Sequence, residues 1–149
     1  MKNLITKIAV AFFLCTLSLN ASNEAEVEKL VDKAYQFCKA EGIEACSKAF
    51  NNKDPRFTQG QLYVFVSKLS GISIAHGGNP KLAGKDLSKV KSPSGIYPGV
   101  EMGKIAAEKG SGWLDYSWSH PVTKRITDKR TFVKRYEGQD ILIGSGFYK

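Results

Sequence analysis

Motifs for catalysis and for metal binding are missing from this sequence. Its 149 residues hold only two histidines, His76 and His120, and three cysteines. Neither histidine has the spacing of a metal site such as HExxH, and there is no CxxC pair, GxSxG turn, Walker loop or GxGxxG turn. No pair of carboxylates stands out at the end of an expected strand. The sequence therefore predicts a protein that is not an enzyme and has no cofactor or metal.

Long apolar runs are also scarce, because only residues 8–19 form one. Twelve residues of helix rise about 18 Å, which is short of the roughly 30 Å hydrocarbon core of a bilayer. Two lysines stand before or at the start of the run, as in a secretory signal. We expect a signal peptide over residues 1–21, cleaved after Ala21, and a mature domain over 22–149 in the periplasm or outside the cell. An uncleaved anchor and a lipoprotein are the alternatives.

Acidic residues are outnumbered by basic ones. The formal net charge is +8, and loss of the two lysines of the signal leaves it near +6. A basic surface of this strength permits contact with anions, acidic partners or anionic lipid. The basic residues are spread along the chain, with one denser patch over 124–135. We expect no nucleic-acid partner, and a soluble basic surface explains the charge equally well.

Hydrophobic periodicity predicts an α+β domain. Apolar residues at three- and four-residue spacing from Val27 to Cys38 predict a long amphipathic helix that ends at Gly42, before a short helix over 43–50. Five later segments are rich in β-branched and aromatic residues, and one further helix starts at Pro98. The predicted strands cover 62–66, 72–76, 112–118, 131–136 and 141–148. Short turns join neighbouring strands, so we expect an antiparallel sheet of PAS-like outline covered by the first helix.

The two cysteines of the mature chain, Cys38 and Cys46, are candidates for a disulfide in an exported protein. In one straight helix their Cα atoms would be about 12 Å apart, beyond the roughly 4.4–6.8 Å of a disulfide. A helix break at Gly42 would let the chain fold back. The bridge therefore depends on that break and would be structural.

Four residues are candidates for contacts with a ligand. His76 ends a predicted strand beside the long Gly-, Pro- and Ser-rich segment 77–97, and Trp113 and Tyr116 stand in an aromatic strand. Lys134 lies two positions after Phe132, so the two side chains share one face of the strand. An inward-facing cation needs a bound carboxylate or a fixed acidic residue as its partner. A surface histidine and ordinary aromatic core packing explain the other candidates equally well.

Several blocks in order resemble a known family, the single Cache domain of type 2. These blocks span nearly all of the mature chain. They are 60–66, 75–76 with 79–87, 110–118 with Pro121 and Thr123, 132–134, and 144–148. The resemblance implies a long N-terminal helix on a five-stranded antiparallel sheet, with a pocket between the sheet and the segment that joins the second and third strands.

The same resemblance implies an extracytoplasmic domain that binds a small organic acid or a similar metabolite. Carried over by position, Lys134 would pair with the carboxylate, His76 and Tyr116 would add hydrogen bonds, and Trp113 would complete the wall. We expect a stand-alone exported binding protein, acting as a sensor or solute-binding component or with a separate membrane receptor or transporter. An envelope interaction protein without a small-ligand site is the alternative, and an enzyme or haem-type sensor using His76 is a third.

Overall fold

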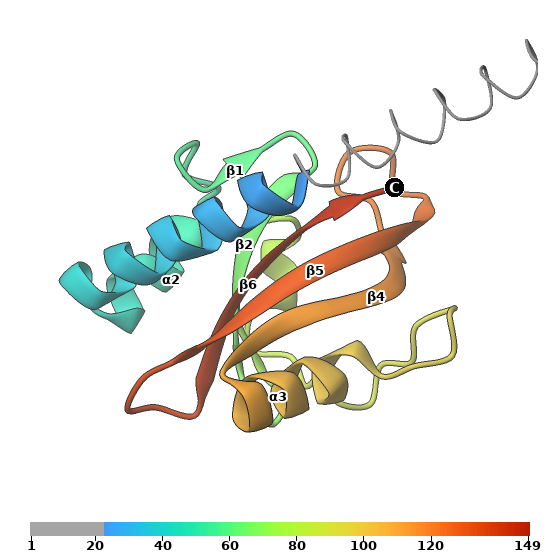
Figure 1. Cartoon of the computed structure of the whole chain (residues 1–149). Helices are drawn as coiled ribbons and strands as arrows, with labels where there is room; N and C mark the ends of the chain where they lie inside the picture. Colours follow the sequence, from blue (N-terminus) through green and yellow to red (C-terminus); the bar gives the residue numbers. More distant parts are fainter. Residues whose placement is uncertain (1–22) are drawn as a thin grey trace, which may run out of the picture.

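The computed structural model describes residues 23–149, and the predicted signal peptide lies outside these residues. Within them, no helix combines the length and the apolar character needed to cross a bilayer. An antiparallel sheet runs through the molecule with helices against both of its faces (Figure 1). The predicted α+β class is therefore confirmed.

The sheet has the strand order β1-β2-β6-β5-β4, and β3 pairs with β2 beside the short β1. Every pairing is antiparallel. The strands are β1 Thr58–Gln59, β2 Leu62–Lys68, β3 Ser73–His76, β4 Ser111–Ser119, β5 Ile126–Tyr136 and β6 Ile141–Tyr148. The five longer ones correspond to the five predicted strands, whereas the two-residue β1 has too short a pattern to be predicted.

One face of the sheet is covered by the N-terminal helix, which occupies residues 23–41, and by α2 (Ile43–Asn51) (Figure 1). The predicted apolar stripe is buried there, since Val27, Val31, Ala34 and Cys38 are at most 1% exposed. These side chains pack with the sheet residues of the same face, including Val64 and Val66. The amphipathic helix therefore lies where its stripe predicts.

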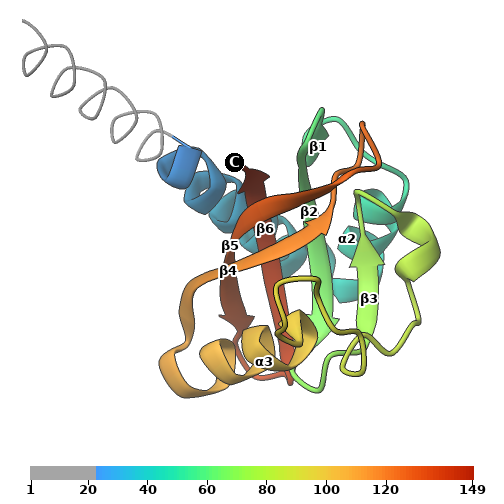
Figure 2. The ribbon, with the colours of Figure 1, turned by 90° about the vertical axis from the view of Figure 1, so that its right-hand side faces the viewer.

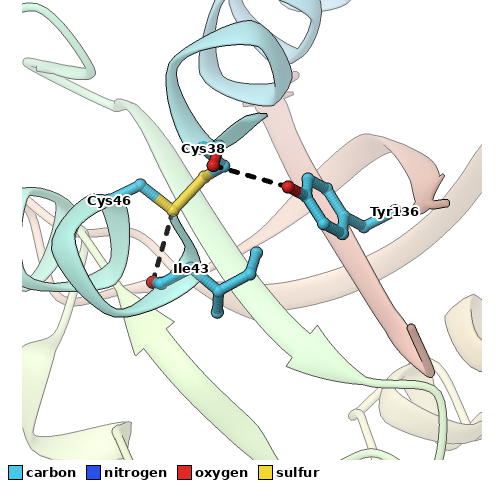
Figure 3. The surroundings of a disulfide bond; sticks show 4 residues. All are labelled: Cys38, Ile43, Cys46 and Tyr136. Atoms are coloured by element: carbon cyan, nitrogen blue, oxygen red, sulfur yellow. Dashed lines mark hydrogen bonds between the residues drawn. A yellow bond between two sulfur atoms is a disulfide. The ribbon is translucent and has the colours of Figure 1, made fainter. Parts of the chain in front are cut away.

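Gly42 separates the two helices and lets the chain reverse direction. Its φ of 87° lies in the region that side chains with a Cβ rarely adopt. The reversal brings the Cα atoms of Cys38 and Cys46 to 5.1 Å, and the structure joins their sulfur atoms in a disulfide (Figure 3). The Tyr136 hydroxyl donates to the Cys38 carbonyl at 3.4 Å, which ties this corner to β5 (Figure 3).

The opposite face of the sheet is covered by α3 (Pro98–Lys109) and by the segment that leads to it (Figure 2). Proline at the first turn needs no backbone N–H partner, and Gly110, with φ 77°, ends the helix. Ala106 is fully buried against Val133 and Leu142 of the sheet. The segment 77–97 contains one short 3-10 helix, Pro80–Leu82, and is otherwise irregular. Together α3 and this segment enclose a pocket.

The main departure from the predicted elements is the start of β5. The sequence predicts a loop up to Lys129 and a strand from Thr131, but β5 begins at Ile126. The strand pairs with β4 without interruption from Ser119↔Ile126 to Ser111↔Lys134. A short turn closed by the His120 amide donating to the Arg125 carbonyl makes this length possible. Polar residues between 126 and 130 hide the strand from pattern analysis.

Gly103 sets how closely α3 approaches the turn that follows β2. A Cβ at this position would overlap the backbone carbonyl of Leu69, which cannot swing away as a side chain could. Gly103→Ala should therefore destabilise the domain by about 1–3 kcal/mol, although alanine is ordinarily favoured in a helix by about 1 kcal/mol. Urea unfolding monitored by circular dichroism measures the change. Ala107→Gly, at an exposed position of the same helix, is the matched control for the ordinary preference, and a gain in stability for Gly103→Ala would contradict the tight contact.

Candidate functional site

The pocket lies between the sheet and α3 and is mostly apolar. Its cavity volume, measured as the space open to the centre of a water molecule, is about 30 Å³, enough for one or two water molecules. Strands β2, β3 and β4, the turn at Gly71, and the segment from Leu87 to Met102 contribute its walls. The lining residues are Phe65, Ser67, Gly71, Ser73, His76, Leu87, Pro98, Gly99, Met102, Tyr116 and Trp118. An apolar pocket with a few polar groups is typical of a small-ligand site.

His76 ends β3 and is one of these polar groups. Its side chain is buried, and its ring Nδ1 accepts a hydrogen bond from the Asn79 amide at 2.9 Å. The His76 amide donates to the side-chain oxygen of Asn51, which fixes the strand end to α2. Burial, assisted by the nearby Lys129 ammonium, lowers the pKa of His76 from 6.5 to about 3. The ring is therefore neutral at physiological pH, with its proton on Nε2 as a donor.

Tyr116 supplies a second donor from β4. The Thr131 hydroxyl donates to its phenolic oxygen at 3.2 Å, so the phenol keeps its own proton for another acceptor. Burial raises the pKa of Tyr116 far above 10 and keeps the phenol protonated. Its ring stands edge-on to Trp118 with centroids 5.9 Å apart. Tyr116 is thus a rigid neutral donor in the pocket wall.

Ser73 adds a hydroxyl to the same pocket. The side chain is 2% exposed, and its oxygen has no hydrogen-bond partner among residues 23–149. A buried hydroxyl without a partner is unfavourable. A polar ligand atom or a water in the pocket would satisfy it.

Lys129 of β5 is a buried cation next to the pocket. It is 1% exposed, and its ammonium lies 4.2 Å from the ring centroid of Tyr63, 5.1 Å from that of Tyr148 and 5.8 Å from that of Phe65. Phe65 lines the pocket, and His76 packs on both Phe65 and Tyr63. Lys129 itself is not a lining residue, so it adjoins the pocket through these rings.

The polar contacts of Lys129 leave its charge without a counter-ion. Its Nζ donates to the Tyr63 hydroxyl at 2.7 Å, and over the described part of the chain no carboxylate lies within salt-bridge distance. The Tyr148 hydroxyl donates to the Ser119 carbonyl, so the Tyr63 hydroxyl donates to Tyr148 and accepts from Lys129. A protonated lysine has three N–H donors, and two have no partner in residues 23–149. Burial lowers the pKa of Lys129 from 10.5 to about 7.

The structure brings only two of the four predicted ligand contacts together. His76 and Tyr116 line the pocket, whereas Trp113 and Lys134 lie on the other face of the sheet, under the N-terminal helix. Lys134 pairs with Asp32 of that helix at 2.7 Å. Lys134 therefore has the fixed acidic partner of the alternative interpretation and does not line this pocket, and its pairing with a ligand stays a prediction.

Trp113 also has its partners on the face of the sheet that the N-terminal helix covers. Its indole N–H donates to Glu28 at 3.2 Å, and its ring packs on Phe132 and Phe147. Trp113 lies an odd number of residues before Tyr116 and Trp118, so it points to the opposite face of β4. The aromatic residue that completes the pocket wall is Trp118 instead.

Sequence reasoning also missed Lys129, Tyr63 and Ser73. Lys129 lies in the stretch that the sequence predicts as a loop, so strand alternation gives its side chain no facing direction. A strand that started at Ile126 would have placed Lys129 on the same face as Thr131 and Val133, which are fully buried. The length of β5 was therefore the missing signal for the buried cation.

Comparison with known proteins identifies relatives of this chain. The family model dCache_2, described as a Cache domain, matches residues 27–149. The methyl-accepting chemotaxis protein McpP of Pseudomonas putida strain KT2440 is 30% identical over 86 residues, which are 58% of this chain and 16% of that protein. The chain therefore corresponds to a small part of this relative.

Solved structures share the fold over nearly the whole length. A methyl-accepting chemotaxis protein from Vibrio parahaemolyticus RIMD 2210633 superposes with a TM-score of 0.77 at 18% identity, covering 89% of this chain and 92% of that one. A Cache chemosensory domain described for the structural basis of its carboxylic acid recognition has a TM-score of 0.71 at 27% identity, with 88% and 96% covered. A periplasmic sensor domain of a chemotaxis protein has a TM-score of 0.65 at 28% identity, with 89% and 93% covered.

Proposed function

This chain belongs to the Cache domain family, and on that basis we propose that it is an extracytoplasmic sensor module that binds a small carboxylate beside α3. Cache domains bind ligands and are not enzymes, so the prediction that the chain is not an enzyme is confirmed. A chemosensory role is part of the proposal and is supported by the chemotaxis proteins to which the chain is similar. The carboxylate and the location are further parts of it.

The buried charge of Lys129 is the observation that carries the carboxylate proposal. A buried cation is costly unless an anion and hydrogen bonds compensate it. In residues 23–149 the only hydrogen-bond partner of its ammonium is the phenol of Tyr63. A ligand carboxylate that reaches past the ring of Phe65, which separates the ammonium from the pocket, would accept the two remaining ammonium N–H groups. The role that the sequence assigned to Lys134 therefore passes to Lys129.

The other polar groups of the pocket support a carboxylate or a ligand that carries one. Neutral His76 and neutral Tyr116 each offer a donor, and neither brings a negative charge that would repel an anion. The apolar side chains of Leu87, Pro98 and Met102 would face the carbon skeleton. Because the free volume is small, we expect an acid of few carbon atoms, admitted with a modest outward shift of α3 or of the segment before it.

The setting of the domain is part of the proposal. The predicted signal at 1–21 and the Cys38–Cys46 disulfide both fit an exported protein. A similar solved domain is described as periplasmic and as part of a chemotaxis protein. We propose a periplasmic domain of the single Cache type 2 that works with a membrane receptor or transporter.

A thermal-shift screen against small carboxylates tests the function. Acetate, propionate, lactate and succinate are compared with acetamide and propionamide, which have similar shapes but no charge. At one hundred times its dissociation constant a ligand adds about 2.7 kcal/mol, which raises the Tm by several degrees. Stabilisation by an acid and not by its amide is the expected result. Absence of stabilisation by any acid would contradict the proposal and favour the envelope interaction protein.

A further inference from the structure

We propose that a carboxylate enters this pocket together with one proton taken from solution, so that the affinity for the anion falls as the pH rises above neutrality. This inference rests on the proposed function and adds its regulation. The proton goes to the side-chain nitrogen of Lys129. The neutral amine, a proton and the carboxylate anion together form an ammonium–carboxylate pair, so charge and atoms balance.

The geometry around Lys129 makes the ligand-free ammonium unstable. The side chain is 1% exposed. Its ammonium lies near the rings of Tyr63, Phe65 and Tyr148 and donates one hydrogen bond, to the Tyr63 hydroxyl. These rings attract a cation weakly compared with the water that it has lost. No acidic side chain among residues 23–149 compensates the charge within 4 Å. The ligand-free site therefore favours the neutral amine at alkaline pH.

A bound carboxylate reverses this preference. It supplies the missing negative charge and accepts the ammonium N–H groups that have no partner. An opposite charge at hydrogen-bond distance in a buried site raises the pKa of a lysine strongly. Burial alone lowers the pKa of Lys129 to about 7. Between this value and the raised value of the complex, each binding event takes up close to one proton.

The other titratable groups facing Lys129 keep their protonation state across pH 6–9. Tyr63 of β2 and Tyr116 of β4 have pKa values raised well above 10 by burial. The pKa of Tyr148 of β6 is raised to about 12, again by burial. His76 of β3 is neutral throughout, because burial lowers its pKa to about 3.

The charged residues next to Lys129 in the sequence point away from it, because neighbours on a strand face opposite sides of the sheet. Asp128 accepts a hydrogen bond from the Ser117 hydroxyl, and Arg130 pairs with Glu24. His120, in the β4–β5 turn, packs against Tyr148, with the two ring centroids 4.6 Å apart. His120 is therefore the group that a control variant must address.

Isothermal titration calorimetry of the protein with sodium propionate, and with sodium acetate, tests the inference. Titrations in HEPES and in Tris at the same pH give the number of protons taken up, because the two buffers release different heats on ionisation. We expect about 0.9 proton per ligand at pH 8 and about 0.1 at pH 6. The dissociation constant should rise about 100-fold from pH 6 to pH 9.

Two variants assign the proton. His120→Gln should keep the uptake of wild type. Lys129→Arg keeps a permanent positive charge, so any remaining binding should be independent of pH. If the arginine does not fit the cavity, the wild-type titrations decide alone.

The outcomes separate the two proposals. Binding with equal affinity from pH 6 to pH 9 and with equal heats in both buffers would overturn the proton coupling and leave carboxylate binding intact. Uptake that disappears in His120→Gln would also overturn the assignment to Lys129. Absence of binding at pH 6, where the site carries its charge, would contradict the proposed function itself.

Discussion

Lys129→Met should abolish carboxylate binding and at the same time make the ligand-free domain more stable. Methionine has a similar length and fills the same space without a charge. The variant loses the only buried cation that adjoins the pocket in the described residues, so we expect the affinity for a stabilising acid to fall more than 100-fold. That change corresponds to about 2.7 kcal/mol or more of binding free energy.

The gain in stability has the same physical origin as the loss of binding. In the ligand-free domain at pH 6 the buried ammonium has one phenolic partner and no counter-ion. Replacing buried charges by apolar side chains of similar volume often stabilises a protein by about 1–4 kcal/mol. Urea unfolding at pH 6 measures the free energy of unfolding, and thermal shift with propionate measures binding. Tyr63 keeps its contact with Tyr148 in the variant, so the neighbouring hydroxyl is not left without a partner.

Lys134→Met is the matched control, because Lys134 stands on the same strand and faces the N-terminal helix. It removes an ion pair with Asp32 whose two side chains are 37% and 60% exposed. Such exposed pairs contribute at most about 1 kcal/mol. We expect unchanged carboxylate binding in this variant. If instead Lys134→Met lost binding and Lys129→Met retained it, the ligand would lie on the face of the sheet that the N-terminal helix covers.

The contrast between these two lysines shows what the sequence could and could not predict. Phe132 and Lys134 do share a face, as the strand alternation predicts, and the acidic partner left open for Lys134 is Asp32. The strand pattern alone could not tell which face of the sheet holds the pocket, since both faces are covered by helices; the family resemblance implied the face beside the segment between the second and third predicted strands. That choice is set by the packing of α3 and of the segment before it, which no local periodicity encodes.

The fold was easier to predict than the site because its signals are local. The stripe from Val27 to Cys38 fixes the buried side of the N-terminal helix, and Gly42 marks the reversal after it. Proline at position 98 and glycine at position 110 delimit α3. The site depends instead on register: Tyr116 stands opposite Lys129, and Lys129 opposite Tyr148. Register across three strands is not visible in one sequence without the exact length of β5.

Acid should destabilise the domain through His76 before its carboxylates titrate. The ring is neutral when folded, with its pKa lowered from 6.5 to about 3, and it takes up a proton readily when unfolded. The unfolded chain therefore binds more protons at this residue between these two values, so the contribution of His76 to stability is full above pH 6.5 and is lost as the pH falls. From pH 7 to pH 4.5 the loss should reach about 2–3 kcal/mol, measured by urea unfolding at each pH.

The choice of window and variants isolates this histidine. The pKa values of Asp54, Asp86 and Asp115 are lowered from 3.8 by their hydrogen bonds and nearby cations, against the opposing effect of burial, so these groups stay ionised above pH 4.5. His76→Asn keeps an acceptor near the position of Nδ1 for the Asn79 amide and removes the titration. We expect this variant to be less stable than wild type at pH 7, because it leaves a cavity, yet to change little on acidification. His120→Gln, the control at the other histidine, should follow wild type. An equal loss in His76→Asn and wild type would mean that the acid sensitivity arises elsewhere and that His76 is not held neutral in the pocket wall.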